Sequence, residues 1–211
     1  RWCNGFYLQK GTMVRKLRIA SEDRRRPDKV YEIGIEVRNG KGRYRDTNIV
    51  ALAPRYQIEN SSSYRLDITQ KFATANEAES KENLTSVLPN SNVAFHWPRT
   101  DQDRLLCVRI SNFSNCHWSG GFAVEINSSF HLNIRDAQGK SHFIRLEILS
   151  QCATIFIVFS DTVNLPPSIR VDNFSEVPIE FFQTNTLFDW MKTTVRPKSS
   201  QPYAWDESTL K

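Results

Sequence analysis

The four histidines of the chain are its natural candidates for proton transfer or metal binding, because imidazole changes charge near neutral pH. They stand apart in the sequence, and two of them fall in segments with strand-like alternation. The four are His96, His117, His131 and His142. The sequence holds no HExxH motif, no G-x-S-x-G turn and no glycine-rich phosphate loop. We therefore expect a protein that is not an enzyme, with no catalytic residues, no cofactor and no metal site.

The four cysteines do not have the spacing of a zinc site or of a redox pair. They are Cys3, Cys107, Cys116 and Cys152, and no two of them form a C-x-x-C pair. Cys107 and Cys152 lie inside or beside apolar segments, where a free cysteine packs as a small hydrophobic residue. We expect reduced thiols.

Five N-x-S/T sequons leave another class of protein open, a secreted and glycosylated β-sandwich. Serine and threonine are common in this chain, so several sequons are expected by chance. Two of the five also belong to a repeated element described below. The five asparagines are Asn60, Asn83, Asn112, Asn127 and Asn173.

The basic residues are densest near the start of a chain whose net charge is +5. The cluster consists of Arg15, Lys16, Arg18, Arg24, Arg25 and Arg26. Acidic residues are interleaved with it, which favours a solvated loop. The alternative is a membrane-surface or phosphoinositide-binding module in which Arg24, Arg25 and Arg26 hold acidic lipid. We expect no nucleic-acid partner.

Residues 54–70 and 167–183 are two copies of one element. Asn60 and Asn173 occupy the same place in the two copies and lie 113 positions apart. Five matched pairs carry the repeat: Pro54 with Pro167, Ile58 with Val171, Asn60 with Asn173, Ser62 with Ser175 and Gln70 with Gln183. A repeated element favours a scaffold or adaptor over an enzyme with a single site.

Each repeated asparagine follows a strand-like segment and precedes a serine by two positions. Asparagine tolerates positive φ, and its side chain can bond to the backbone two residues on. One interpretation is therefore that Asn60 and Asn173 each hold a corner between two strands. The other is that they orient the backbone at a peptide-binding edge.

The repeat extends beyond this element, and it leaves the domain boundaries open. The segment W-x-x-G-F begins at Trp2 and again at Trp118, and an aromatic-x-Trp segment ends at Trp97 and again at Trp205. One division places a first β module at residues 1–98 and a second at 99–211. Alternatively, residues 1–98 hold the end of one module and the start of the next. In that case a complete module lies at residues 51–163.

Many short segments rich in Val, Ile and Phe predict an all-β fold. They alternate between apolar and polar residues, as half-buried strands do. The predicted strands cover residues 30–37, 55–59, 64–69, 93–97, 104–110, 121–126, 130–134, 142–148, 153–159, 168–172, 177–182 and 202–205. With little helix, they indicate antiparallel β-sandwich modules in tandem. Residues 71–84 are polar and are expected to form a long loop or a short helix.

The phrases WSGGF at Trp118–Phe122, DNFS at Asp172–Ser175 and YAWDE at Tyr203–Glu207 carry a family resemblance. With the sequence around them, they resemble the vacuolar protein sorting 13 family of bridge-like lipid-transfer proteins. The similarity falls in the adaptor-binding region, where repeated all-β modules each carry one hallmark asparagine. Asn60 and Asn173 occupy that position here.

The resemblance implies a cytoplasmic protein, peripheral at organelle membrane contact sites, in agreement with reduced cysteines. It implies that this region recruits the parent protein by binding short Pro-x-Pro motifs of organelle adaptor proteins. The parent would transfer glycerophospholipids elsewhere in its chain, and membrane association of this region would be indirect. An extended motif can lie along a sheet edge, with backbone hydrogen bonds for affinity and side-chain pockets for specificity.

Overall fold

A computed structural model describes residues 3–21, 27–71, 83–112, 115–184, 186 and 188–210. Within these ranges the chain forms sixteen β-strands in five sheets and two short 3-10 helices, η1 (Gly42–Tyr44) and η2 (Asp189–Met191). The predicted all-β class with little helix is confirmed.

The first sheet is an antiparallel meander. Its strands are β1 (Gly11–Ile19), β2 (Lys29–Asn39) and β3 (Asn48–Pro54). The alternating residues Ile35 and Val37 of β2 are almost fully buried. The basic residues Arg15, Lys16 and Arg18 lie on β1, so the expected solvated loop is wrong for this part of the cluster.

A β-sandwich follows, built from two sheets. The five-stranded sheet has the order β10-β11-β12-β4-β7, with β4 (Tyr56–Ser61), β7 (Ser91–Phe95), β10 (Ser128–Arg135), β11 (Ser141–Gln151) and β12 (Thr154–Asp161). The four-stranded sheet has the order β6-β5-β8-β9, with β5 (Leu66–Gln70), β6 (Thr85–Val87), β8 (Leu105–Ile110) and β9 (Phe122–Ala123).

One hydrophobic core lies between these two sheets. Ile58, Ile144 and Ile157 from the larger sheet and Leu66 and Val108 from the smaller one are fully buried and belong to it. Alternation along each strand directs these side chains to one face. The core cluster extends in sequence from Tyr56 to Phe159.

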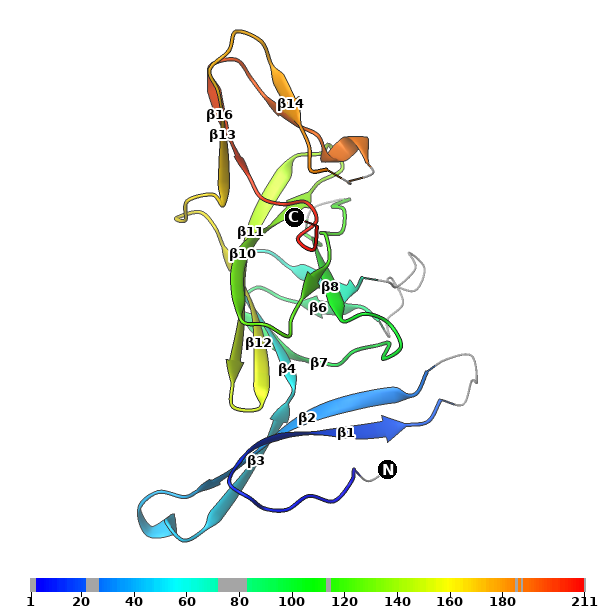
Figure 1. Cartoon of the computed structure of the whole chain (residues 1–211), viewed down its shortest axis with the longest axis vertical. Helices are drawn as coiled ribbons and strands as arrows, with labels where there is room; N and C mark the ends of the chain where they lie inside the picture. Colours follow the sequence, from blue (N-terminus) through cyan, green and yellow to red (C-terminus); the bar gives the residue numbers. More distant parts are fainter. Residues whose placement is uncertain are drawn as a thin grey trace.

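The C-terminal part forms two small antiparallel sheets. They are β13 (Ile169–Asn173) with β16 (Ser199–Tyr203), and β14 (Ile179–Phe181) with β15 (Thr193–Val195). Figure 1 shows the β1–β3 sheet at one end of an elongated molecule, the sandwich in the middle and the β13–β16 strands at the other end.

The central strands β12 and β4 pair in parallel, although about a hundred residues separate them in the sequence. Ile155 lies opposite Tyr56, Ile157 opposite Ile58, and Phe159 opposite Asn60. The β10–β12 meander therefore completes a sheet that β4 and β7 begin.

The structure corrects several predicted strands. Of residues 121–126 only Phe122 and Ala123 form a strand, and the carbonyl of the preceding Gly121 accepts from the Ser208 hydroxyl. Strands β1, β3, β6 and β15 were not predicted. Most of the polar segment 71–84 falls outside the described residues.

Candidate functional site

The side chain of Asn60 holds a corner at the end of β4. Its Nδ2 donates to the carbonyl oxygens of Tyr64 at 2.7 Å, Val87 at 3.2 Å and Leu88 at 3.1 Å. Its Oδ1 accepts from the backbone N–H of Ser62 at 3.1 Å and from the Ser62 hydroxyl at 2.6 Å. The residue is 1% exposed, so these bonds replace water for every polar atom of the amide.

Asn173 makes the same set of contacts at the end of β13. Its Nδ2 donates to the carbonyl oxygens of Val177 at 2.8 Å, Val195 at 3.1 Å and Arg196 at 3.1 Å. Its Oδ1 accepts from the Ser175 N–H at 2.9 Å and hydroxyl at 2.7 Å. Because all polar atoms of the two amides have partners within the chain, a ligand contact would require breaking one of these bonds.

The second matched pair of amides, Gln70 and Gln183, also repeats its contacts. Gln70 donates to the Arg99 and Asp103 carbonyls at 3.1 and 2.9 Å and accepts from the Arg99 N–H at 3.1 Å. Gln183 donates to the Glu207 carbonyl at 2.9 Å and to that of Leu210, and it accepts from the Glu207 N–H at 2.8 Å. Each glutamine fixes the segment that follows its aromatic-x-Trp motif.

The strand registers show that the repeat is structural. Asn60 lies opposite Ser91 in the β4–β7 pair, and Asn173 lies opposite Ser199 in the β13–β16 pair. The same equivalence holds for β5–β6 and β14–β15, where Leu66 faces Val87 and Ile179 faces Val195. Strands β13–β16 are thus a second copy of β4–β7.

The WSGGF segment joins the sandwich to the end of the C-terminal copy. The Gly120 N–H donates to the Asp206 carbonyl at 3.1 Å, and the Ser208 hydroxyl donates to the Gly121 carbonyl at 2.6 Å. A Cβ on Gly120 would lie 2.3 Å from the Asp206 carbonyl oxygen, so only glycine allows this approach.

A buried ion pair lies at the same contact between the sandwich and the C-terminal copy. Arg135, at the end of β10, donates from Nε and Nη2 to the two Asp206 oxygens at 2.6 and 2.9 Å, and both residues are under 5% exposed. Asn133 Nδ2 donates to the same carboxylate at 2.8 Å, and the Tyr203 hydroxyl also donates to it at 3.1 Å. Burial, together with the Asp206 charge, raises the pKa of Tyr203, so its hydroxyl remains a donor. We name these four residues the C-terminal joint.

A second polar cluster joins the β1–β3 sheet to the sandwich. Glu32 on β2 accepts from Arg104 Nη2 at 2.8 Å and forms an ion pair with Lys16 at 3.2 Å. Arg104 also donates to the Tyr56 hydroxyl at 2.9 Å, and Tyr56 donates to Glu125 at 2.8 Å. Burial raises the pKa of Tyr56 to about 12. We name these five residues the N-terminal joint.

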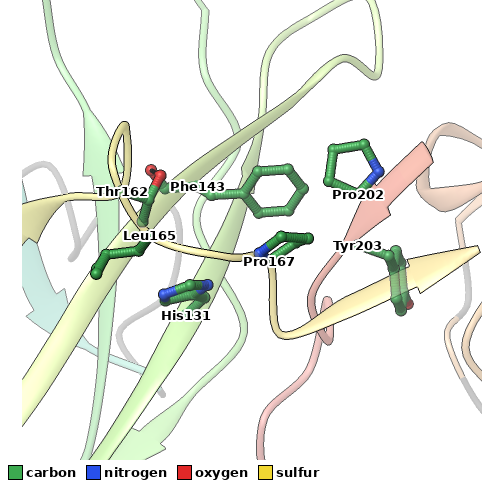
Figure 2. Close-up of a pocket in the computed structure, with 7 residues that line it drawn as sticks. All are labelled: His131, Phe143, Thr162, Leu165, Pro167, Pro202 and Tyr203. Carbon is green, nitrogen blue, oxygen red and sulfur yellow. Dashed lines mark hydrogen bonds between the residues drawn. The ribbon is translucent and has the colours of Figure 1, made fainter. Parts of the chain in front are cut away.

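A cavity of about 260 Å³ lies where the sandwich meets the C-terminal strands (Figure 2). Its lining is mostly apolar, with a histidine and a threonine. Burial and the nearby Arg145 charge lower the pKa of His131, so its ring is neutral at pH 7. The lining residues are His131 of β10, Phe143 of β11, Thr162, Leu165 and Pro167 of the connection to β13, and Pro202 and Tyr203 of β16.

The histidines and cysteines occupy separate environments. His117 stacks on Trp190 with ring centres 4.0 Å apart, and His142 bonds to Asp136 at 3.1 Å. All four cysteines are free. Among the residues that the structure describes, no group of three or more His, Cys, Asp and Glu side chains could hold a metal ion.

The remaining candidate residues are the sequon asparagines and the three consecutive arginines. Asn60 and Asn173, which are also sequon positions, are buried with their amides engaged, whereas Asn112 and Asn127 are exposed. Arg24, Arg25 and Arg26 lie outside the described residues. Across the described ranges, no helix has the length and apolar character needed to span a bilayer.

The comparisons with known proteins agree on one protein family. The model of the family "Vacuolar-sorting associated protein 13, adaptor binding domain" matches residues 1–211. The chain is 49% identical to human intermembrane lipid transfer protein VPS13D over 210 residues, 99% of this chain and 5% of that protein. It is 39% identical to Drosophila melanogaster Vps13D over 207 residues, 98% of this chain and again 5% of the relative.

A fungal relative is more distant. Intermembrane lipid transfer protein VPS13 of Chaetomium thermophilum is 29% identical over 186 residues, 82% of this chain and 5% of that protein. The chain therefore spans a small fraction of the length of each of these relatives. Its full-length match and its identity to the animal proteins confirm the resemblance in the sequence: the chain belongs to the vacuolar-sorting associated protein 13 adaptor-binding domain family.

Proposed function

We propose that this chain is a non-catalytic adaptor-binding region that recruits a lipid-transfer protein to organelle membrane contact sites by binding short Pro-x-Pro motifs. The family match over residues 1–211 supports the adaptor-binding role. Transfer of glycerophospholipids belongs to other parts of the parent protein in this proposal. Location in the cytoplasm and indirect attachment to the membrane follow from recruitment through adaptors.

The cavity between the sandwich and the C-terminal strands is the feature that best supports a peptide site. Its volume of about 260 Å³ lies below the range of roughly 300–1,000 Å³ common for small-molecule sites, so it suits one or two peptide side chains. Phe143 and Tyr203 supply aromatic surface, and Pro167 and Pro202 add rigid apolar walls (Figure 2). Proline-rich segments dock in aromatic-lined grooves of this kind, because they have little conformational entropy to lose.

The edge of the larger sheet adjoins this cavity. Strand β10 is an outer strand of that sheet, and its residue His131 lines the cavity. In the proposed complex an extended motif lies beside β10 and inserts a proline ring between Phe143 and Tyr203. Asn60 and Asn173 then act indirectly, by holding the corners that keep the units in shape.

Binding of labelled Pro-x-Pro peptides to the chain tests the proposal directly. Replacing Phe143 by Ala removes an aromatic wall and is expected to weaken binding about tenfold or more, equivalent to about 1.4 kcal/mol. The matched control is Leu88→Ala, which shortens a side chain that is 58% exposed in the connection between β6 and β7 and does not line the cavity. Thermal melting of both variants separates lost affinity from lost folding. Equal affinity of Phe143→Ala and wild type would place the peptide elsewhere.

A further inference from the structure

Two connections in the chain are equivalent to each other. The β1–β3 meander corresponds to the β10–β12 meander, since both are antiparallel, follow a W-x-x-G-F segment and lead into the repeated element. Strand β4 corresponds in turn to β13, which ends in the same asparagine corner. The connection from β3 to β4 therefore has its counterpart in the connection from β12 to β13.

The strand registers align the two connections residue by residue. The last pair of the β2–β3 ladder is Ile33 with Pro54, and the last pair of the β11–β12 ladder is Ile144 with Asp161. Each of these pairs lies next to the point where the chain leaves its meander. The residue that follows each ladder is therefore the first residue of its connection.

The first residue of each connection makes an equivalent hydrogen bond. The Arg55 N–H donates to the Glu32 carbonyl at 3.2 Å, and the Thr162 hydroxyl donates to the Phe143 carbonyl at 3.2 Å. In both cases the acceptor is the residue just before the last pair of the ladder. Arg55 therefore matches Thr162, and Glu32 matches Phe143.

Beyond this point the second connection carries an insertion. Strand β4 begins at Tyr56, directly after Arg55, whereas the matching β13 begins at Ile169, seven positions after Thr162. Residues 163–168 thus have no counterpart in the first connection. Figure 1 shows them as a loop between the sandwich and the C-terminal strands.

The insertion forms part of the cavity wall. Leu165 and Pro167 come from the insertion itself, while Phe143 of β11 and Tyr203 of β16 lie on the strands at either side (Figure 2). The cavity of about 260 Å³ therefore lies where the inserted residues separate the C-terminal copy from the sandwich.

The same place at the first connection is occupied by side chains. Glu32, in the position of Phe143, is 6% exposed and accepts from Arg104 Nη2 at 2.8 Å. Beside it, the Tyr31 ring packs edge-on against His96 with ring centres 4.8 Å apart. A buried ion pair and two packed rings thus take the place of an apolar cavity wall.

We propose that the length of the insertion, residues 163–168, determines which of the two connections takes a proline-containing peptide. This inference rests on the proposed function of the chain. Six residues add a reach of up to about 20 Å, which allows the C-terminal copy to stand away from β11. The single residue of the first connection gives no such freedom, so the matching strands lie in direct contact.

Deletion of residues 163–168 from the whole chain tests the role of the insertion. Thr162 then joins Ile169 directly, which draws the C-terminal copy toward β11. Xenon binds in apolar cavities and detects the cavity without any peptide. Xenon should shift the NMR ring signals of Phe143 and Tyr203 in the wild type but not in the deletion variant. The affinity for a Pro-x-Pro peptide should fall at least tenfold.

The matched control replaces residues 163–168 by six Gly and Ser residues, which keeps the length of the connection. It should retain the xenon shifts and bind the peptide more tightly than the deletion variant does. Equal loss of the shifts in the two variants would overturn the role of length. Thermal melting shows whether each variant is folded. If the full deletion unfolds the chain, deletion of residues 163–165 decides, and it should weaken both xenon uptake and peptide binding.

The two measurements separate this inference from the proposed function. A wild type that takes up xenon but binds no Pro-x-Pro peptide would contradict the proposed function. Loss of xenon uptake on deletion would still support the role of the insertion in that case. A folded deletion variant that keeps the xenon shifts and the peptide affinity would overturn the role of the insertion and leave adaptor binding intact. A wild type without xenon shifts would overturn the cavity itself.

Discussion

Asparagine is a short side chain that offers two N–H donors and a carbonyl acceptor together, and the corners at Asn60 and Asn173 use all three. Aspartate would turn a charged carboxylate toward three carbonyl oxygens. Serine could not reach two separate segments. These requirements explain why the same residue type occurs twice within a diverged repeat.

Replacing Asn60 by Ala is expected to lower the free energy of unfolding by about 3 kcal/mol, because it leaves buried carbonyl groups without a donor. Asn173→Ala should cost less, because its corner borders more exposed residues such as Val177, which is 61% exposed. Urea unfolding measures both values, with the exposed Asn92→Ala on β7 as the control. An Asn60→Ala protein as stable as the wild type would show that the corner bonds contribute little.

The asparagine positions could be predicted from the sequence because a repeat marks them and local spacing to a serine suggests the turn. The residues of the two joints could not be predicted from the sequence. Arg135 and Asp206 lie 71 positions apart, and Glu32 and Arg104 lie 72 apart. No local pattern connects such residues, and only the fold brings them together.

At the scale of elements, the molecule depends on how its sheets are fastened to one another. The C-terminal joint ties the end of β10 to the segment after β16 through Arg135 and Asp206. A buried ion pair adds little to the free energy of unfolding when compared with well-packed apolar residues. Removal of one partner is nevertheless costly, because it leaves an uncompensated buried charge. The pair therefore holds the C-terminal strands in one position more than it adds to stability.

A double-mutant cycle tests this joint. Arg135→Leu leaves the buried Asp206 carboxylate without its cationic partner. We expect it to lower the free energy of unfolding by about 3–5 kcal/mol. The double variant Arg135→Leu with Asp206→Leu should recover a large part of that loss, since no buried charge remains. Chemical denaturation measures the free energy of unfolding of the wild type, the two single variants and the double variant. Strictly additive effects would contradict coupling between the two side chains.

Alternation of apolar residues predicted most of the strands and failed where other forces decide the structure. Strand β1 carries Arg15, Lys16 and Arg18, so its sequence suggests a loop, yet pairing along β2 keeps it extended. Strand β3 holds Ala51, Ala53 and Pro54, which are weak strand formers. Its place is determined by its neighbour β2 and by the sequence that continues directly into β4.

At the scale of the whole molecule, the β1–β3 sheet forms one end of the elongated molecule (Figure 1), and the N-terminal joint fastens it to the sandwich through Glu32 and Arg104. Burial raises the pKa of Glu32, but hydrogen bonds and charges from Arg104 and Lys16 outweigh it and hold the pKa below its ordinary value of 4.5. A lowered carboxyl pKa contributes stability above the unfolded pKa, and this stability is lost as pH falls through the folded pKa.

The stability added by Glu32 should therefore be present at pH 7 and disappear in acid. Glu32→Gln is expected to melt at a lower temperature than the wild type at pH 7, and the difference should shrink as the pH falls below about 4.5. Thermal melting of both proteins from pH 7 to pH 3 measures the effect. A difference that stays constant over this range would mean that the charge of Glu32 does not hold the N-terminal joint.

The parallel pairing of β12 with β4 has a consequence for how such proteins change length in evolution. Because the sandwich takes strands from two successive repeats, a tandem duplication of one period supplies one set of strands like β4–β7 and one like β10–β12. This holds wherever within the period the duplication begins. The inserted copy closes one further sandwich and reuses an interface that already exists, so an array can gain or lose one sandwich at a time.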